Sequence, residues 1–257
     1  MSDLHLDPVT LSMPDGPLLI VAAGSQDQER VSPPHRHARG QLFGSLRGLM
    51  SVTVPDGVWL VPAIHAVWLP PDVVHSARSH GPFEGWSVYL DPAACAALPP
   101  GPCTMRTSDL LRAAVLRAAT FPAGPLDPGQ ARLAQVIVDE IGRLPVEPLG
   151  LPLPRDARLQ RVARALIADP ADARDLRGWA DWAGLSERTL SRRFVAETGF
   201  HFTAWRQRAR MMRSLEMLAA GLPVTRIAFD LGYASASAFI GLFRRTFGAT
   251  PSIYRRR

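Results

Sequence analysis

Three histidines and a glutamine in the first third of the chain are spaced so that they could bind a ligand together. His35, His37 and Gln41 share odd parity, so on one continuous strand their side chains would point to the same face. His75 follows on a different predicted strand. Imidazole nitrogens bind divalent transition metals, and they also hydrogen-bond anionic ligands. These residues therefore predict a polar binding site, with a metal ion and an anionic small molecule as the two open alternatives.

The sequence lacks the residue patterns of the common enzyme classes. It contains no Ser/His/Asp or Cys/His arrangement for nucleophilic catalysis, no GxGxxG or Walker motif, and no paired catalytic carboxylates. Cys95 and Cys103 lie outside any CxxC pattern, and we interpret them as structural thiols. We therefore expect a protein that is not an enzyme.

Basic residues are concentrated in the C-terminal part of the 257-residue chain. Residues 1–150 contain 10 Arg and 14 Asp or Glu, a formal charge of −4. Residues 151–257 contain 19 Arg and 9 Asp or Glu, a formal charge of +10, and the chain has no Lys. A basic half beside a mildly acidic half predicts a polyanionic partner for residues 151–257.

The N-terminal region shows the pattern of a small β-barrel followed by helices. Residues from about 10 to 100 contain short apolar or alternating runs, broken by Pro and Gly, such as LLIVAA, GVWLVP and WSVYL. Residues 107–143 change to helical spacing, with one apolar stripe at 110–116 and another at 133–141. These stripes could bury within the chain or against a second subunit. The segment PVEPLGLPLP (145–154) has four prolines and is predicted to be a linker.

Residues 176–199 show the pattern of two helices joined by a tight turn. In LRGWADWAGLSERTLSRRFVAETG, apolar residues at helical spacing predict a first helix that ends at Gly184. Ser186 then caps a second helix whose apolar side carries Leu190 and Phe194. A helix, a glycine turn and a capped helix form the helix-turn-helix pattern, predicted here over about 176–197.

The same pattern returns as VTRIAFDLGYASASAFIGLFRRTFG, which predicts a second helix-turn-helix unit over about 224–247. Residues 202–221 between the two units have the spacing of one uninterrupted helix, which at 1.5 Å per residue is roughly 27–30 Å long. That length is close to the separation of about 34 Å between successive major grooves on one face of a duplex. The two units therefore predict binding to double-stranded DNA.

Residues 156–257 resemble the DNA-binding domain of AraC/XylS-family transcriptional regulators. The resemblance covers about 100 residues and is carried by LSERTLSRRFVAETG, IAFDLGYASASAFIGLFRRTFG and ATPSIYR. It implies a sequence-specific transcriptional regulator, with RNA polymerase as a candidate partner. The side chains expected to contact DNA are polar and lie off the buried stripes. They are Ser186, Glu187, Arg188, Ser191, Arg192, Ser235, Ser237, Arg244 and Arg245.

The second recognition helix departs from the family pattern. Small or apolar residues stand where the family often carries large polar base-readers, namely Ala236, Ala238, Ile240 and Gly241. Ala and Ile can touch a thymine methyl group but cannot form a bidentate hydrogen bond to a base. We therefore expect the first helix-turn-helix unit to supply most direct readout of the bases, through Arg188, Ser191 and Arg192. The second helix-turn-helix unit should mainly position the domain.

The segments PPHRHARGQLFGSLRG (33–48) and LPPDVVHS (69–76) resemble the cupin signature. In that signature a His-x-His pair, an acidic residue and a later histidine converge on a metal inside a small barrel. The resemblance implies the ligand set His35, His37, Gln41 and His75, which would suit one divalent transition metal such as Zn, Ni, Fe or Mn. Gln41 replaces the usual glutamate and is a weaker ligand, which argues against a redox enzyme site. Asp72 stands at the usual glycine.

The predicted fold class is α+β with several domains. A cupin-like or jelly-roll-like sensor barrel occupies 1–105, a helical segment and candidate homodimer contact occupies 106–144, a Pro-rich linker occupies 145–155, and an all-α DNA-binding domain occupies 156–257. We expect a small-molecule effector to bind in the barrel and control DNA binding. The alternatives are a metal-dependent cupin enzyme fused to a DNA-binding domain, and a DNA-binding protein without an effector.

The expected location is the cytoplasm. No apolar run approaches the roughly 20 residues that a membrane helix needs. The first residues, MSDLHLDPVT, are acidic and lack the apolar core of a signal peptide.

Overall fold

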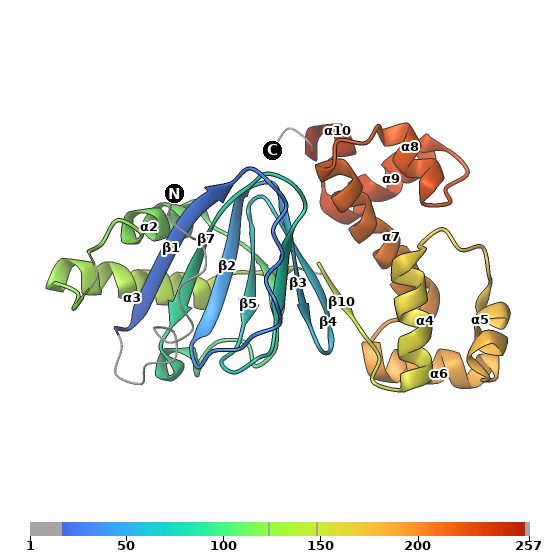
Figure 1. Cartoon of the computed structure of the whole chain (residues 1–257), viewed down its shortest axis with the longest axis horizontal. Coiled ribbons are helices and arrows are strands. Elements are labelled where there is room, and N and C mark those ends of the chain that lie inside the picture. The colour runs from blue at the N-terminus through green and yellow to red at the C-terminus, as the bar shows by residue number, and fades with distance from the viewer. Residues whose placement is uncertain (1–16, 123, 148, 255–257) are drawn as a thin grey trace. The chain divides into compact units, whose positions relative to one another are not determined.

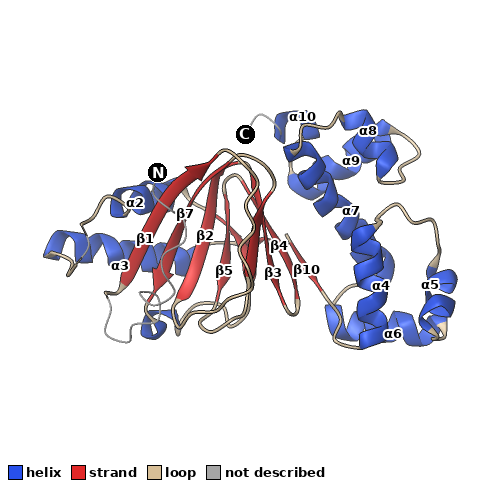
Figure 2. Ribbon diagram, in the orientation of Figure 1, coloured by secondary structure: helices blue, strands red, loops and turns tan. Residues whose placement is uncertain are grey.

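A computed structural model describes residues 17–122, 124–147 and 149–254 (Figures 1 and 2). The segment MSDLHLDPVT, interpreted above as lacking a signal core, lies outside the described residues. The chain forms two compact units. The first contains residues up to 150 except 55–58, and the second contains 55–58 together with residues from 151 onward. No described helix is both long enough and apolar enough to cross a membrane.

The first unit is built on two sheets. The six-stranded sheet has the order β1 (Leu19–Gln26), β7 (Phe83–Leu90), β2 (Gly40–Arg47), β5 (His65–Leu69), β8 (Cys103–Arg106) and β9 (Val146–Glu147). The four-stranded sheet has the order β10 (Gly150–Pro152), β4 (Gly57–Pro62), β3 (Leu49–Val54) and β6 (Ser76–Ser79). A short 3-10 helix, η1 (Pro92–Cys95), follows β7. The predicted β-rich N-terminal domain is confirmed.

Alternate residues of the central strands belong to two different cores. Phe43 on β2 packs between the two sheets with Val52 of β3. Its neighbour Leu42 faces the other side, where it joins Trp68 and Trp86. Because side chains alternate along a strand, β2 is buried on both faces, and it places Gln41 on the same side as Phe43, between the sheets. Trp59, Trp68 and Trp86 are all buried in these cores.

Two helices, α2 (Asp109–Ala118) and α3 (Pro128–Arg143), complete the first unit beside β1 and β7 (Figure 1). Their buried residues Leu111, Val115, Ile137 and Ile141 pack into the core on the outer face of the six-stranded sheet. The predicted stripe at 110–116 is therefore split. Leu110 and Leu116 point away from this core and are 55% and 40% exposed.

The predicted linker contains more regular structure than its prolines indicate. It includes β9 and β10, and each is the outermost strand of its sheet. Proline is compatible with such edge strands because one side of the strand makes no ladder hydrogen bonds.

The second unit is helical over its described residues beyond β10. Its elements are α4 (Ala157–Ala168), α5 (Leu176–Ala183), α6 (Glu187–Thr198), α7 (Phe202–Ala219), α8 (Val224–Asp230), α9 (Ala236–Phe247) and α10 (Pro251–Tyr254). Both predicted helix-turn-helix units and the uninterrupted helix between them are confirmed. Gly184 and Gly232 adopt left-handed φ values of 65° and 76° at the two turns, a conformation that glycine adopts without the steric cost of a side chain.

Candidate ligand site and nucleic-acid interface

The structure brings His35, His37 and His75 together in the first unit. One ligand atom from each lies within 4.8 Å of the others. The histidines do not share a continuous strand as expected, because β2 begins only at Gly40. An isolated antiparallel bridge places His35 opposite His75 instead, with reciprocal main-chain N–H···O distances of 2.9 and 2.8 Å. The cluster is therefore assembled by pairing between two segments of the chain, and not by alternation of side chains along one strand.

A main-chain carbonyl holds each of the three imidazoles at Nδ1. The distances are 2.9 Å from His35 to Pro33, 2.7 Å from His37 to Arg39 and 2.9 Å from His75 to Val73. Because a carbonyl oxygen can only accept, each Nδ1 carries the hydrogen, and Nε2 has the lone pair of the neutral ring. Histidine ligands of metals are commonly oriented in this way, through a hydrogen bond from the nitrogen that does not bind the ion.

Gln41 lies beside His37. Its Oε1 is 3.3 Å from His37 Nε2, and its Nε2 is 3.1 Å from Ser87 Oγ and 3.2 Å from Tyr89 Oη. Burial lowers the pKa of His37, so the ring is neutral near pH 7 and its Nε2 is an acceptor. His37 Nε2 and Gln41 Oε1 would then both be acceptors. They are compatible at this distance if they share a cation, or if the Gln41 amide is reversed so that its NH2 group donates to His37.

Asp72 supports the cluster through its backbone. It has a left-handed φ of 61°, and its N–H donates to the carbonyl of His37 at 3.0 Å. Glycine adopts this conformation at no steric cost. Aspartate is one of the few other residues that tolerates it.

The space beside the cluster is small. A cavity of about 10 Å³ is lined by His35, Gln41, Phe43, Val52, Leu69, His75 and Ala77. That volume is close to the roughly 10–15 Å³ that one water molecule needs. It accommodates a metal ion or a water, whereas an organic anion would require the lining residues to move.

Recognition helix α6 presents polar side chains on the side opposite its core contacts. Leu190 and Phe194 are fully buried, whereas Glu187, Arg188 and Arg192 are exposed and Ser191 is half-buried. Arg193 on the same helix forms an ion pair with Asp156 at 2.5 Å. Among the described residues neither Arg188 nor Arg192 has a carboxylate partner, so both guanidinium groups can bind an external acceptor.

The predicted serine caps of both recognition helices are confirmed. The Oγ atoms of Ser186 and Ser235 accept hydrogen bonds from the N–H groups of Thr189 and Ala238, each at 3.2 Å. Ser237 is exposed in the first turn of α9, and Arg244 and Arg245 are exposed in its last turn. Contact of these side chains with DNA stays a prediction.

Tyr89 and Ser87 belong to the histidine cluster but were missed by the sequence analysis. The β2–β7 pairing sets Gln41 opposite Tyr89, and the Tyr89 ring meets the His37 ring edge-on at a centroid distance of 5.4 Å. Alternation in WSVYL places both residues on one face of a strand, but only the strand pairing identifies what that face meets.

Two family comparisons cover almost the whole chain. Residues 17–177 match the AraC-like ligand binding domain, and residues 179–257 match a helix-turn-helix domain. The chain is 35% identical over 230 residues to the HTH-type transcriptional regulator NimR of Escherichia coli strain K12, covering 88% of this chain and 83% of that protein. It is 39% identical over 112 residues to RipA of Corynebacterium glutamicum, an HTH-type transcriptional regulator, covering 44% and 33% of the two chains.

Among solved structures, unsaturated fatty acid bound ToxT from Vibrio cholerae strain SCE256 aligns with 92% of this chain and 94% of its own, with a TM-score of 0.39 and 13% identity. A two-sheet ligand-binding unit followed by paired helix-turn-helix units defines a ligand-responsive DNA-binding regulator. The chain belongs to the AraC family of transcriptional regulators. The family predicted from the sequence is thus confirmed.

Proposed function

We propose that the chain recognises specific duplex sequences mainly through α6, under the control of a small molecule that binds in the first unit. The observation that carries this function is the pair of capped helix-turn-helix units joined by the 18-residue helix α7. We further propose that the protein acts in the cytoplasm and works with RNA polymerase there.

The direct test is selection of duplexes from a random library by the full-length protein at moderate salt. The expected outcome is enrichment of one sequence class, with a strongly specified segment that receives α6 and a weakly specified segment about one helical turn away that receives α9. The function would be contradicted if the protein bound every duplex as well as bulk competitor, because phosphate contacts alone do not distinguish sequences.

The difference in polarity between the recognition helices supports a division of labour. The N-cap serines align the helices, and Arg188 and Arg192 of α6 then correspond to Ser237 and Gly241 of α9. Arginine can form a bidentate contact to guanine, which glycine cannot. The two arginines of α9, Arg244 and Arg245, lie in its last turn, far from the N-terminal residues that usually reach bases. We therefore assign base readout to α6 and phosphate contacts to Arg244 and Arg245.

We propose that the histidine cluster binds one divalent transition metal through the Nε2 atoms of His35, His37 and His75, with Gln41 Oε1 as a weak fourth ligand. Three arguments support this site: the convergence of the imidazoles, their orientation by carbonyls at Nδ1, and a cavity suited to a single small species. The ion would supply a Lewis-acid centre. His35 is the half-buried member of the cluster and marks the side from which an anionic effector could approach.

The metal site predicts one ion per chain. Equilibrium dialysis of the full-length protein against Zn²⁺ or Ni²⁺, followed by elemental analysis, should give this stoichiometry. His37→Ala should weaken affinity by more than the roughly 10–100-fold that loss of an outer-shell partner causes. His65→Ala is the matched control, because His65 also contacts a carbonyl through Nδ1 but lies outside the cluster. Equal binding by the two variants would contradict the site.

We propose that the first unit has no catalytic activity. The neutral amide of Gln41 favours a sensor, and so do the relatives NimR and RipA, which are both transcriptional regulators. Gln41→Glu supplies the carboxylate of the cupin signature. It should tighten metal binding without metal-dependent oxygen consumption, and such consumption would favour the enzyme alternative.

We propose that α2 and α3 also contact a second copy of the chain. Leu110, Leu116 and Val136 are 55%, 40% and 39% exposed, whereas the other large apolar residues of the two helices are buried or half-buried. Sedimentation velocity of the full-length protein at micromolar concentration should show a dimer, and Leu110→Glu should shift it towards the monomer. A wild-type monomer would rule out the dimer, leaving intrachain packing as the only role of these helices.

A further inference from the structure

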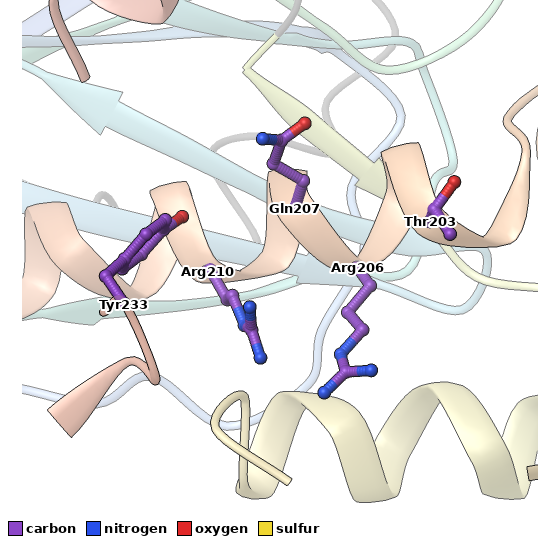
Figure 3. Close-up of a pocket in the computed structure, with 5 residues that line it drawn as sticks. All are labelled: Thr203, Arg206, Gln207, Arg210 and Tyr233. Carbon is purple, nitrogen blue, oxygen red and sulfur yellow. The ribbon is translucent and has the colours of Figure 1, made fainter. Parts of the chain in front are cut away.

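A cavity of about 320 Å³ lies on the side of α7 in the second unit. It is lined by Thr203, Arg206, Gln207, Arg210 and Tyr233. The first four residues follow one another at helical spacing along α7, and Tyr233 comes from the turn between α8 and α9. Figure 3 shows Arg206 and Arg210 extending from the same side of the helix, with the Tyr233 ring beside Arg210.

Main-chain carbonyls hold both guanidinium groups in place. Arg206 donates from Nη1 to Arg174 O at 2.8 Å and from Nη2 to Asp172 O, and Arg210 donates from Nε to Pro170 O at 2.7 Å. These carbonyls belong to the loop before α5. The turn between α8 and α9 lies against the same loop, because a Cβ added to Gly232 would come within 3.5 Å of Ala171 O. The cavity therefore lies where the two helix-turn-helix units meet.

The cavity walls contain positive charge and unused donors. Among the described residues Arg206 and Arg210 form no ion pair, and the nearby Asp172 is bound to Arg174 at 2.6 Å. The Arg210 Nη groups donate to no described residue, and the buried Arg206 Nε and Tyr233 hydroxyl also have no partner there. Burial and then the charge of Arg210 lower the pKa of Arg206. A bound anion would offset the repulsion between the Arg206 and Arg210 guanidinium groups, and it would accept hydrogen bonds from the unused donors.

We propose that this cavity binds a phosphate group of the DNA backbone between the stretches of duplex that receive α6 and α9, with the Arg210 guanidinium as the principal donor. The inference rests on the proposed binding of duplex DNA. Helix α7 joins α6 to α8. A duplex that receives α6 and α9 in successive major grooves therefore has its intervening backbone between the two helix-turn-helix units. The paired N–H groups of a guanidinium match the geometry of phosphate oxygens. A free phosphate ion offers the same chemistry and is the competing source.

The test measures how the affinity of the full-length protein for its selected duplex depends on salt. Arg210→Gln should reduce the slope of log K against log[salt] by about 0.9 and weaken binding roughly 5–10-fold near 0.1 M salt, without changing the ranking of sequences. Arg213→Gln is the matched control on the same helix, because Arg213 is exposed and already paired with Glu216 at 2.6 Å. It should behave as wild type.

A second measurement changes the duplex, replacing single backbone phosphates by neutral methylphosphonates, and compares the wild-type protein with Arg210→Gln. One or two positions between the stretches that receive α6 and α9 should weaken wild-type binding to a similar degree, and the same positions should have little effect on Arg210→Gln. The wild-type part of this measurement is informative even if Arg210→Gln folds poorly. A duplex with no sensitive position there, or an Arg210→Gln slope equal to that of Arg213→Gln, would overturn the proposal.

Inorganic phosphate distinguishes the two sources. If millimolar phosphate raised the melting temperature of wild type above a chloride control of equal ionic strength, with no such rise in Arg210→Gln and no change in the duplex salt slope, the cavity would bind free phosphate and the DNA proposal would be overturned. Failure of the wild-type protein to select any duplex would contradict the proposed function itself, and it would be detected before any Arg210 variant is compared.

Discussion

Trp205→Ala is expected to lower the free energy of unfolding of the second unit by about 3–5 kcal/mol. Trp205 is fully buried, its ring meets Phe194 of α6 edge-on at 5.4 Å, and its Nε1 donates to Pro152 O at 2.7 Å. The alanine variant loses this apolar burial and leaves a cavity between α6 and α7. Urea unfolding of the full-length protein, followed by helical circular dichroism, measures the change.

Two further variants make this result specific. Trp205→Phe keeps an aromatic ring but removes the donor to Pro152, so its cost should be smaller, about 1–2 kcal/mol. Phe229→Ala removes a ring that is 61% exposed on α8 in the same unit, and it should change stability by no more than about 0.5 kcal/mol. Equal costs for Trp205→Ala and Phe229→Ala would show that Trp205 does not support the packing of α6 on α7.

The double variant Arg188→Ala/Arg192→Ala is expected to weaken binding to the selected duplex by about 2–6 kcal/mol, or roughly 30-fold and more, if each arginine contributes a bidentate base contact. Binding to unrelated duplexes should fall less, because phosphate contacts elsewhere on the domain remain. Titration of a panel of duplexes with single base changes measures both quantities.

The matched double variant Arg244→Ala/Arg245→Ala should behave differently. If these residues contact phosphates, affinity should fall by a similar factor for every duplex, and the salt slope should fall by about 2. A sequence-selective loss for Arg244 and Arg245, together with a uniform loss for Arg188 and Arg192, would reverse the assignment of the two helices.

The helix-turn-helix units could be predicted well because their signals are local. A glycine with positive φ, a serine that caps the next helix and apolar residues at helical spacing all act within one or two turns. Gly184, Ser186 and Leu190 illustrate this, and each has the predicted role in the structure. The helical segment after the barrel was also predicted, but Leu110 and Leu116 were placed on the buried stripe. Which side of an amphipathic helix is buried depends on the surface that covers it, here the outer face of the six-stranded sheet.

Residue types, their spacing and the cupin resemblance identified His35, His37, Gln41 and His75 as candidates, but not the way in which they meet. The bridge between His35 and His75 and the pairing of Gln41 with Tyr89 are contacts between segments distant in the chain. The Arg210 cavity is a second example. Its carbonyl partners lie in the loop before α5, about forty residues earlier in the chain.

The amino-acid sequence by itself determined that this protein has a basic helical half with two DNA-binding motifs and a β-rich half containing a histidine cluster. Charge, periodicity, capping and turn formation depend on residues within a few positions of one another. Only the tertiary structure decided the orientation of the imidazoles, the inclusion of Tyr89 and the cavity beside Arg210. Those features depend on strand pairing and on packing between distant segments, whose geometry no local pattern specifies.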